Sequence, residues 1–270
     1  MAAASPELHR DVHEGRGPFA LLVHGILSGR AQWQPNLAAL AKIARPVVVE
    51  LWGHGRSPSP HDPGAYHPDA YVEAFDRIRA ELGVDRWLLC GQSLGGSLTL
   101  RYALAHPDRV IAQVFTNSVS ALGDEEWRNA RRKTAVSVAE AIVAGGREAI
   151  ERMPIHPLRA TRIPEPAHRA VLDDAAMLDP EGVAMAFRHT ATEASVRNRV
   201  TENRVPTLLV CGEREKRFLP ERDFAIATMP HLEVVNVPGA GHAVNLEAAA
   251  EFDRAVTEFF RRHASGGPLR

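Results

Sequence analysis

The chain has 270 residues, 45% of them hydrophobic, and its 32 lysines and arginines nearly balance its 33 aspartates and glutamates. This length suits one large domain, or one domain with an insertion, that buries a substantial core. The near-neutral charge gives no electrostatic reason to expect a nucleic acid or an anionic membrane as a partner, and no apolar run approaches the roughly 20 residues that cross a bilayer.

Short apolar runs that do not alternate with polar residues recur along the chain, and helical patterns separate them. Such runs are typical of parallel strands that helices cover on both faces. Strands are predicted at residues 19–23, 46–50, 87–90, 110–116, 206–211 and 232–237. Helices are predicted at residues 35–44, 69–82, 93–106, 221–229 and 245–263. This alternation predicts an α/β fold with a doubly wound, mostly parallel sheet and right-handed crossovers.

The alternation stops between residues 120 and 204, where only helical patterns broken by glycine and proline appear. A structureless loop of that length is implausible inside a compact domain. We therefore expect a helical cap at 120–204, inserted between two parts of a core domain at 1–119 and 205–263. Residues 264–270 are expected to form a flexible tail.

Two groups of side chains in the expected cap bear on function. The apolar Trp127, Met153 and Phe187 are candidates to roof a substrate pocket, and the alternative for each is a place in the cap's own core. The basic run at 131–133 lies in a charge-rich helical stretch and is interpreted as a solvated face. The apolar content of the cap predicts a neutral to apolar substrate of modest size.

The sequence Gly-Gln-Ser-Leu-Gly at residues 91–95 joins a predicted strand directly to a predicted helix. A serine between two glycines on such a turn is held above the edge of the sheet, at a helix N-terminus. The partial positive charge of that terminus helps to stabilise an oxyanion. Ser93 is therefore the candidate nucleophile and the Leu94 N–H a candidate oxyanion donor. The alternative is a glycine–serine turn without chemistry.

Two other glycine-containing turns follow predicted strands. After the strand at 19–23, Gly25 permits a sharp turn past the nucleophile, which makes the Ile26 N–H the second candidate oxyanion donor. The preceding His24 is expected to hold this loop in place rather than to act as a base. The turn at 50–57 is interpreted as mainly architectural, with Trp52 as a candidate pocket residue.

His242 is the candidate general base among the thirteen histidines. A serine hydroxyl is a poor nucleophile until a neighbouring group accepts its proton. His242 ends a Pro-Gly-Ala-Gly-His loop that follows the strand at 232–237. This loop belongs to the sheet edge where sites assemble in doubly wound folds. The alternative is an ordinary surface histidine.

The acid that orients His242 is expected between the nucleophile and the base in the chain. Glu215 follows the strand at 206–211 and is the preferred candidate, with Glu213 as its competitor. A second possible location is the stretch after Asn117, where acidic residues occupy 124–126.

These motifs together resemble the α/β-hydrolase superfamily over nearly the whole chain outside the cap. The matching segments are the His-Gly turn at 24–25, Gly-His-Gly-Arg-Ser at 53–57, the elbow at 91–96 and Gly-Ala-Gly-His at 239–242. Members usually carry aspartate at the positions of Glu50 and Glu215. Within the superfamily, residues 115–118, Gly123 and Glu126-Trp127 are similar to the 3-oxoadipate enol-lactonase-like branch.

The resemblance implies hydrolysis of a small-molecule ester or lactone through an acyl-enzyme, with no metal or organic cofactor. One alternative keeps the Ser–His pair but uses it in a carbon–carbon bond hydrolase, a lyase or a cyclase. Another places the chain among non-enzymatic ligand-binding relatives. The first ten residues lack the apolar centre of a secretory signal, and Cys90 and Cys211 each end an apolar run. A cytoplasmic protein with two buried thiols is therefore expected.

Overall fold

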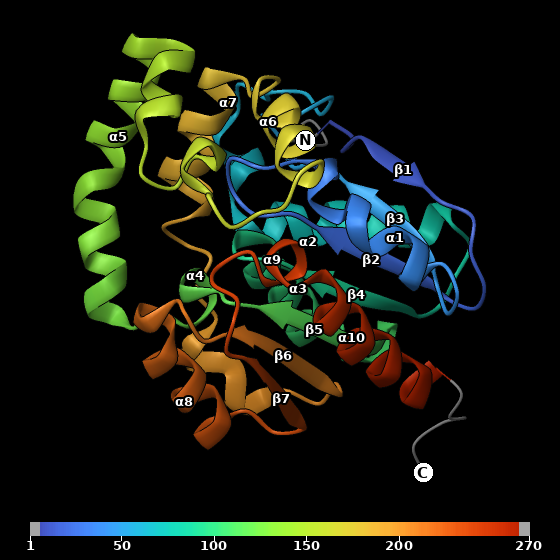
Figure 1. Ribbon diagram of the computed structural model, residues 1–270. Coiled ribbons are helices and arrows are strands. Elements are labelled where there is room, and N and C mark those ends of the chain that lie inside the picture. The colour runs from blue at the N-terminus through green and yellow to red at the C-terminus, as the bar shows by residue number, and fades with distance from the viewer. Residues whose placement is uncertain (1–5, 265–270) are drawn as a thin grey trace.

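A computed structural model describes residues 6–264 of the chain and centres on a seven-stranded sheet (Figure 1). The strand order is β1-β3-β2-β4-β5-β6-β7, and every neighbouring pair is parallel except β1 with β3. The strands are β1 (Arg10–Val12), β2 (Phe19–Val23), β3 (Arg45–Val49), β4 (Trp87–Gly91), β5 (Val110–Thr116), β6 (Thr207–Gly212) and β7 (Leu232–Val237).

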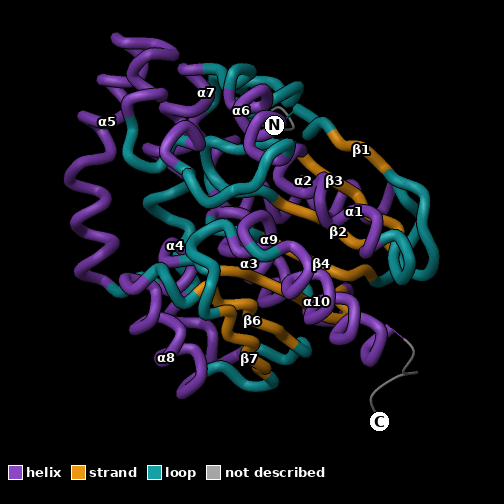
Figure 2. The backbone as a smooth tube through the Cα atoms, in the orientation of Figure 1, coloured by secondary structure: helices purple, strands orange, loops and turns teal. Residues whose placement is uncertain are grey.

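Helices pack against both faces of this sheet (Figure 2). The α-helices are α1 (Gln34–Leu40), α2 (Pro68–Glu81), α3 (Leu94–Ala105), α4 (Val119–Leu122), α5 (Glu125–Arg152), α6 (Ala167–Ala175), α7 (Pro180–Met185), α8 (Leu219–Thr228), α9 (Val244–Glu247) and α10 (Ala249–Ala264). Short 3-10 or π turns are η1 (Arg30–Trp33), η2 (Pro63–Tyr66), η3 (Pro107–Arg109), η4 (Pro157–Arg159), η5 (Ala186–Thr190), η6 (Arg197–Glu202) and η7 (Lys216–Phe218).

The central strand β2 shows why the sheet needs helices on both sides. Successive side chains of a strand point to opposite faces. Leu21 and Val23 pack in the same cluster as apolar residues of α2 and α3. Ala20 and Leu22 pack with apolar residues of α1 and α10 on the other face. The predicted α/β architecture with a doubly covered, mostly parallel sheet is confirmed.

The segment between β5 and β6 contains α4 to α7 and no strand within its described residues. Its long helix α5 contacts α7 and stands at the side of the molecule away from the sheet (Figure 1). Gly146, with φ 55° and ψ −142°, interrupts the helical backbone inside α5. We propose that residues 120–204 are the cap. Of the tail expected at 264–270, Ala264 ends α10 and the remainder lies outside the described residues.

None of the helices within residues 6–264 combines the length and the apolar character that crossing a bilayer requires.

Candidate active site

Ser93 lies on the sharp turn between β4 and α3 and has φ 53° and ψ −119°. The glycines on either side make this turn possible. A Cβ atom at Gly95 would lie 2.1 Å from the carbonyl oxygen of Val23, and one at Gly91 would lie 2.4 Å from that of Gly95. The backbone of the turn therefore packs directly against neighbouring backbone, which holds Ser93 in its strained conformation at the start of a helix.

We expect Gly95→Ala to lower the free energy of unfolding by about 3 kcal/mol, because the new methyl group meets backbone that cannot move aside. Gly239→Ala is the matched control, since a Cβ there meets nothing within 4 Å; we expect its effect to stay within about 0.5 kcal/mol. Urea unfolding of both variants measures the difference. Equal stability of the two variants would contradict the packing described for the turn.

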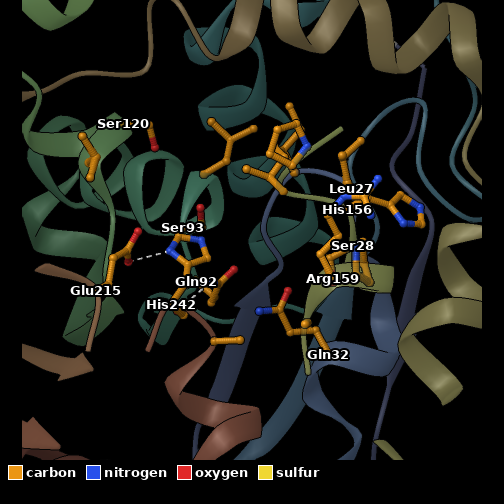
Figure 3. Close-up of a pocket in the computed structure, with 18 of the residues that line it drawn as sticks. Leu27, Ser28, Gln32, Gln92, Ser93, Ser120, His156, Arg159, Glu215 and His242 are labelled. Atoms are coloured by element: carbon orange, nitrogen blue, oxygen red, sulfur yellow. Dashed lines mark hydrogen bonds and ion pairs between the residues drawn. The ribbon is translucent and has the colours of Figure 1, made fainter. Parts of the chain in front are cut away.

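His242 lies between an acidic side chain and the serine. Its Nδ1–H donates a hydrogen bond of 2.7 Å to Glu215 Oε2. Ser93 and His242 line the same cavity, and Figure 3 shows the imidazole between the Glu215 carboxylate and Ser93. Gln92 Nε2–H, from the residue before the serine, donates to the His242 carbonyl at 3.1 Å. The elbow and the histidine loop are thus connected directly.

Glu215 is 9% exposed and follows the end of β6. Asn117, at the end of β5, donates to Glu215 Oε2 at 3.1 Å, and Arg217 Nε–H donates to Oε1 at 2.9 Å. Burial alone would raise the pKa of Glu215, but the hydrogen bonds from His242, Arg217 and Asn117 outweigh it and the pKa is lowered. The carboxylate is therefore ionised at neutral pH.

The competing acids have other partners. Glu213 forms an ion pair with Arg222 at 3.2 Å. Asp124 accepts a hydrogen bond from the Trp127 N–H at the start of α5, and Glu125 pairs with Arg128 on the same helix. The structure therefore places Glu215, rather than these residues, against the imidazole.

Glu247 holds the histidine loop from the other side. It accepts hydrogen bonds from the Gly241 N–H at 2.9 Å and the Ala243 N–H at 3.3 Å, so it fixes the backbone on both sides of His242. The Arg162 side chain from the cap segment pairs with the same carboxylate at 2.7 Å. Sequence reasoning missed Glu247, because a glutamate on a short C-terminal helix carries no motif.

The two proposed oxyanion donors lie on facing turns. Ile26 and Leu94 both line the cavity next to Ser93. Leu94 is the first residue of α3, where an N–H has no acceptor within its own helix. The N–H groups on either side of Ile26 already have hydrogen-bond acceptors. The Gly25 N–H donates to Gln32 Oε1, and the Leu27 N–H donates to His54 Nε2. No acceptor within the described residues is recorded for Ile26, which suits a group that binds an oxyanion.

Two buried histidines hold the turn that contains Ile26 in place. His24 Nδ1–H donates to the Gly25 carbonyl at 2.7 Å, while its Nε2 accepts from the Leu51 N–H at 3.0 Å. His54 Nδ1–H donates to the Trp52 carbonyl at 3.0 Å. Burial lowers the pKa of His24 to about 4 and that of His54 to about 3, so both rings are neutral. Their contacts are structural.

The lowered pKa values of His24 and His54 predict that the folded protein loses stability on mild acidification. Between an unfolded pKa of 6.5 and the folded values, the unfolded chain binds more protons than the folded chain. The free energy of unfolding therefore falls with falling pH, by on the order of 1.4 kcal/mol per pH unit for each histidine. Chemical denaturation at several pH values between about 7 and about 5 measures this slope.

His54→Asn tests the assignment, because it removes one of the two titrating rings. We expect the slope to fall by on the order of 1.4 kcal/mol per pH unit, whereas His61→Asn, at an exposed position, is expected to leave the slope unchanged. Carboxylates contribute equally to the slopes of the wild type and both variants, so their contribution cancels in the comparison. An unchanged slope in His54→Asn would show that this ring does not govern the acid response.

The cavity above Ser93 has a volume of about 390 Å³. Trp127 and Phe187 from the cap segment line it. Trp52 and Met153 do not, so their prediction as pocket residues was wrong. Trp52 is fully buried against Tyr71, with ring centroids 4.4 Å apart, because the turn after β3 directs its indole into the core. Met153 follows α5 and packs against the apolar core of the cap segment.

The cavity wall also contains charged residues that sequence reasoning did not place there. Arg131 is exposed, as are Arg132 and Lys133, which agrees with the interpretation of 131–133 as a solvated face, and Arg131 also lines the cavity. The adjacent Arg132, which is exposed, pairs with the half-buried Glu193 at 2.9 Å. Helical periodicity shows that neighbouring positions face different ways, but it does not show which face covers a site.

Within residues 6–264, no group of three or more His, Cys, Asp or Glu side chains could hold a metal ion.

Comparisons with known proteins bear on the fold of the chain. A family model described as alpha/beta hydrolase fold matches residues 21–140. A putative 2-succinyl-6-hydroxy-2,4-cyclohexadiene-1-carboxylate synthase of Bacillus subtilis is 26% identical, with 88% of each chain covered. A putative carbamate hydrolase of Variovorax paradoxus, RutD, is 29% identical over 96% of this chain and 98% of its own.

A solved structure shares the fold as a whole. The enol-lactonase from Burkholderia xenovorans LB400 superimposes with a TM-score of 0.73 at 24% identity, covering 94% of this chain and 96% of that one. At this identity the likeness concerns the fold.

Proposed function

Since the chain belongs to the α/β-hydrolase superfamily, we propose that it is a serine hydrolase that cleaves a small ester or lactone. The observation that supports this most directly is the 2.7 Å hydrogen bond between Glu215 and His242, beside a serine held on a strained elbow. An ionised carboxylate in that place orients the imidazole and stabilises its protonated form. The arrangement suits nucleophilic catalysis by Ser93.

The proposed reaction runs through an acyl-enzyme. Ser93 Oγ attacks the substrate carbonyl carbon while His242 Nε2 accepts the hydroxyl proton. The N–H groups of Ile26 and Leu94 donate to the oxyanion that forms. When the tetrahedral species collapses, the leaving alcohol takes the proton from His242. Water then loses a proton to His242 and attacks the acyl carbon. When this second tetrahedral species collapses, Ser93 Oγ takes the proton from His242 and the acid leaves, which regenerates Ser93.

A second candidate uses the same side chains without an acyl-enzyme. The Bacillus subtilis relative is named as a putative synthase rather than a hydrolase. In a lyase or cyclase, the Ser–His pair would move a proton on the substrate, and Ser93 would remain unmodified. The same fold supports both chemistries, because function resides in the site.

Mass spectrometry of quenched reactions separates the two candidates. During turnover of a short p-nitrophenyl ester, the serine hydrolase is expected to show a burst of p-nitrophenol and a protein mass increased by the acyl group, both lost in Ser93→Ala. Steady turnover with neither a burst nor an acylated species would argue for general-base chemistry. No turnover of any ester or lactone by folded protein would reject the proposed hydrolase.

A further inference from the structure

The cavity above Ser93 is more positive than the chain as a whole. Its charged lining side chains are Arg131, Arg159, Arg162, Arg217, Glu215 and Glu247. Two of the arginines have carboxylate partners within the cavity wall. Arg162 pairs with Glu247 at 2.7 Å, and Arg217 pairs with Glu215 at 2.9 Å.

The other two arginines lack such partners. For Arg131 and Arg159, no ion pair with an acidic side chain is recorded among residues 6–264. Arg159 forms hydrogen bonds of 3.4 and 3.3 Å to the carbonyls of Glu151 and Arg152, which do not neutralise its charge. Figure 3 shows Arg159 on the Gln32 side of the cavity, opposite Glu215. Two positive charges are therefore left for a bound anion.

Arg131 is held in place although no carboxylate binds it. Its guanidinium carbon lies 5.2 Å from the centroid of the Trp127 ring, so the indole supports the cation. Partial burial and, after it, the charge of Arg217 lower the pKa of Arg131. The Arg131 side chain is exposed to solvent and also lines the cavity. Because Arg131 lies near the positive charge of Arg217, a bound anion stabilises it more than it would stabilise an arginine that already pairs with a carboxylate.

The cavity also offers a buried neutral donor. His156 is only 4% exposed and lines the wall beside Arg159. Its Nδ1 accepts a hydrogen bond from the Leu158 N–H at 3.2 Å, which leaves the ring proton on Nε2. No protein acceptor for that proton is recorded among the described residues. This wall is thus equipped to bind oxygen atoms of a polar substrate.

From these contacts we propose that the substrate carries a carboxylate group, which Arg131 binds from the cap side while the ester or lactone carbonyl lies at Ser93. The inference rests on the proposed function and revises the sequence-based expectation of a neutral to apolar substrate. Trp127 and Phe187 supply the apolar surface for the carbon chain between the two groups. A guanidinium suits this role because its fork of N–H donors matches a carboxylate.

The test compares two esters of equal length, p-nitrophenyl hydrogen glutarate and p-nitrophenyl pentanoate, after subtraction of spontaneous hydrolysis. We expect kcat/KM for the glutarate ester to exceed that for the pentanoate by about tenfold, and high salt to reduce this preference. Arg131→Gln is expected to lose about tenfold on the glutarate ester and to retain pentanoate turnover within about twofold. The matched control Arg132→Gln, which alters a neighbouring arginine already paired with Glu193, is expected to retain both rates.

Calorimetric titration with glutarate tests the anion site independently of catalysis. The wild type is expected to bind glutarate and Arg131→Gln to bind it at least about tenfold more weakly. Pentanoate turnover without a preference for the charged ester, or equal losses on both esters in Arg131→Gln, would overturn the inference and leave the proposed function intact. Glutarate binding that depends on Arg131, without turnover of either ester, would reject the proposed function and retain the anion site.

Discussion

Ser93→Ala is expected to lower kcat for ester hydrolysis about a thousandfold or more while the protein stays folded. The hydroxyl is the atom that forms the acyl bond, and no neighbouring group can replace it at the elbow. Alanine is smaller than serine and keeps a Cβ, so the strained turn between Gly91 and Gly95 is not further crowded. Steady-state kinetics with p-nitrophenyl esters, together with circular dichroism, measure the effect.

Ser137→Ala is the control for this substitution. Ser137 lies on the exposed side of α5 and donates to the Thr134 carbonyl, so its loss is expected to leave kcat within about twofold. The double variant Ser93→Ala/His242→Ala is expected to be no slower than Ser93→Ala alone, because the two side chains act as a unit. More than about a tenth of wild-type activity in Ser93→Ala would contradict nucleophilic catalysis by this serine.

Glu215→Gln is expected to lower kcat by about 10²- to 10⁴-fold, with a smaller effect on KM. The amide keeps the shape of the side chain but removes the negative charge that stabilises a protonated His242. Its NH₂ group can also face His242 Nδ1, which would favour the wrong tautomer of the ring. Kinetics of the purified variant, alongside thermal unfolding, separate a catalytic loss from a loss of fold.

Glu213→Gln provides a matched control two residues away on the same loop. Because Glu213 pairs with Arg222 and not with the imidazole, we expect kcat to change by less than about threefold. The reverse pattern, with Glu213→Gln inactive and Glu215→Gln active, would assign the acid to Glu213. Nearly full activity in both variants would show that hydrolysis does not need a carboxylate on this loop.

The sheet was largely predictable because its strands are buried on both faces. The predicted strands at 19–23, 110–116 and 232–237 coincide residue for residue with β2, β5 and β7. Buried strands read as short apolar runs, and glycine or proline marks their ends. β1 was not predicted, since Arg10–Val12 contains three residues, two of them charged, and pairs only at the edge with β3.

Helix ends were less predictable than strands. The helix expected at 245–263 is two helices, α9 and α10, because Ala248 takes φ −141° and ψ 58° between them. The helix expected from residue 93 begins at Leu94, since Ser93 itself has a positive φ. Apolar periodicity continues through such local departures and does not reveal them.

The candidate site also has one part that the sequence predicts and one part that it does not. Ser93, His242 and Glu215 follow strands that end at one edge of the sheet, so chain position and glycine pattern were enough to select them. The pocket depends on how the cap segment lies over that edge, which the sequence does not encode locally. The places of Arg131 and Arg159 in the cavity wall therefore emerged only from the structure. Trp52 proved to be a core residue, and Met153 is partly buried against the core of the cap segment.

Intact-mass measurement after treatment with a fluorophosphonate tests whether Ser93 is an activated nucleophile, because this reagent modifies serines that a neighbouring base activates. We expect a single adduct on the wild type, located at Ser93 by peptide mapping, and none on Ser93→Ala. Folded wild-type protein that gains no adduct, or a Ser93→Ala variant that gains the same one, would contradict the assignment of Ser93 as an activated nucleophile.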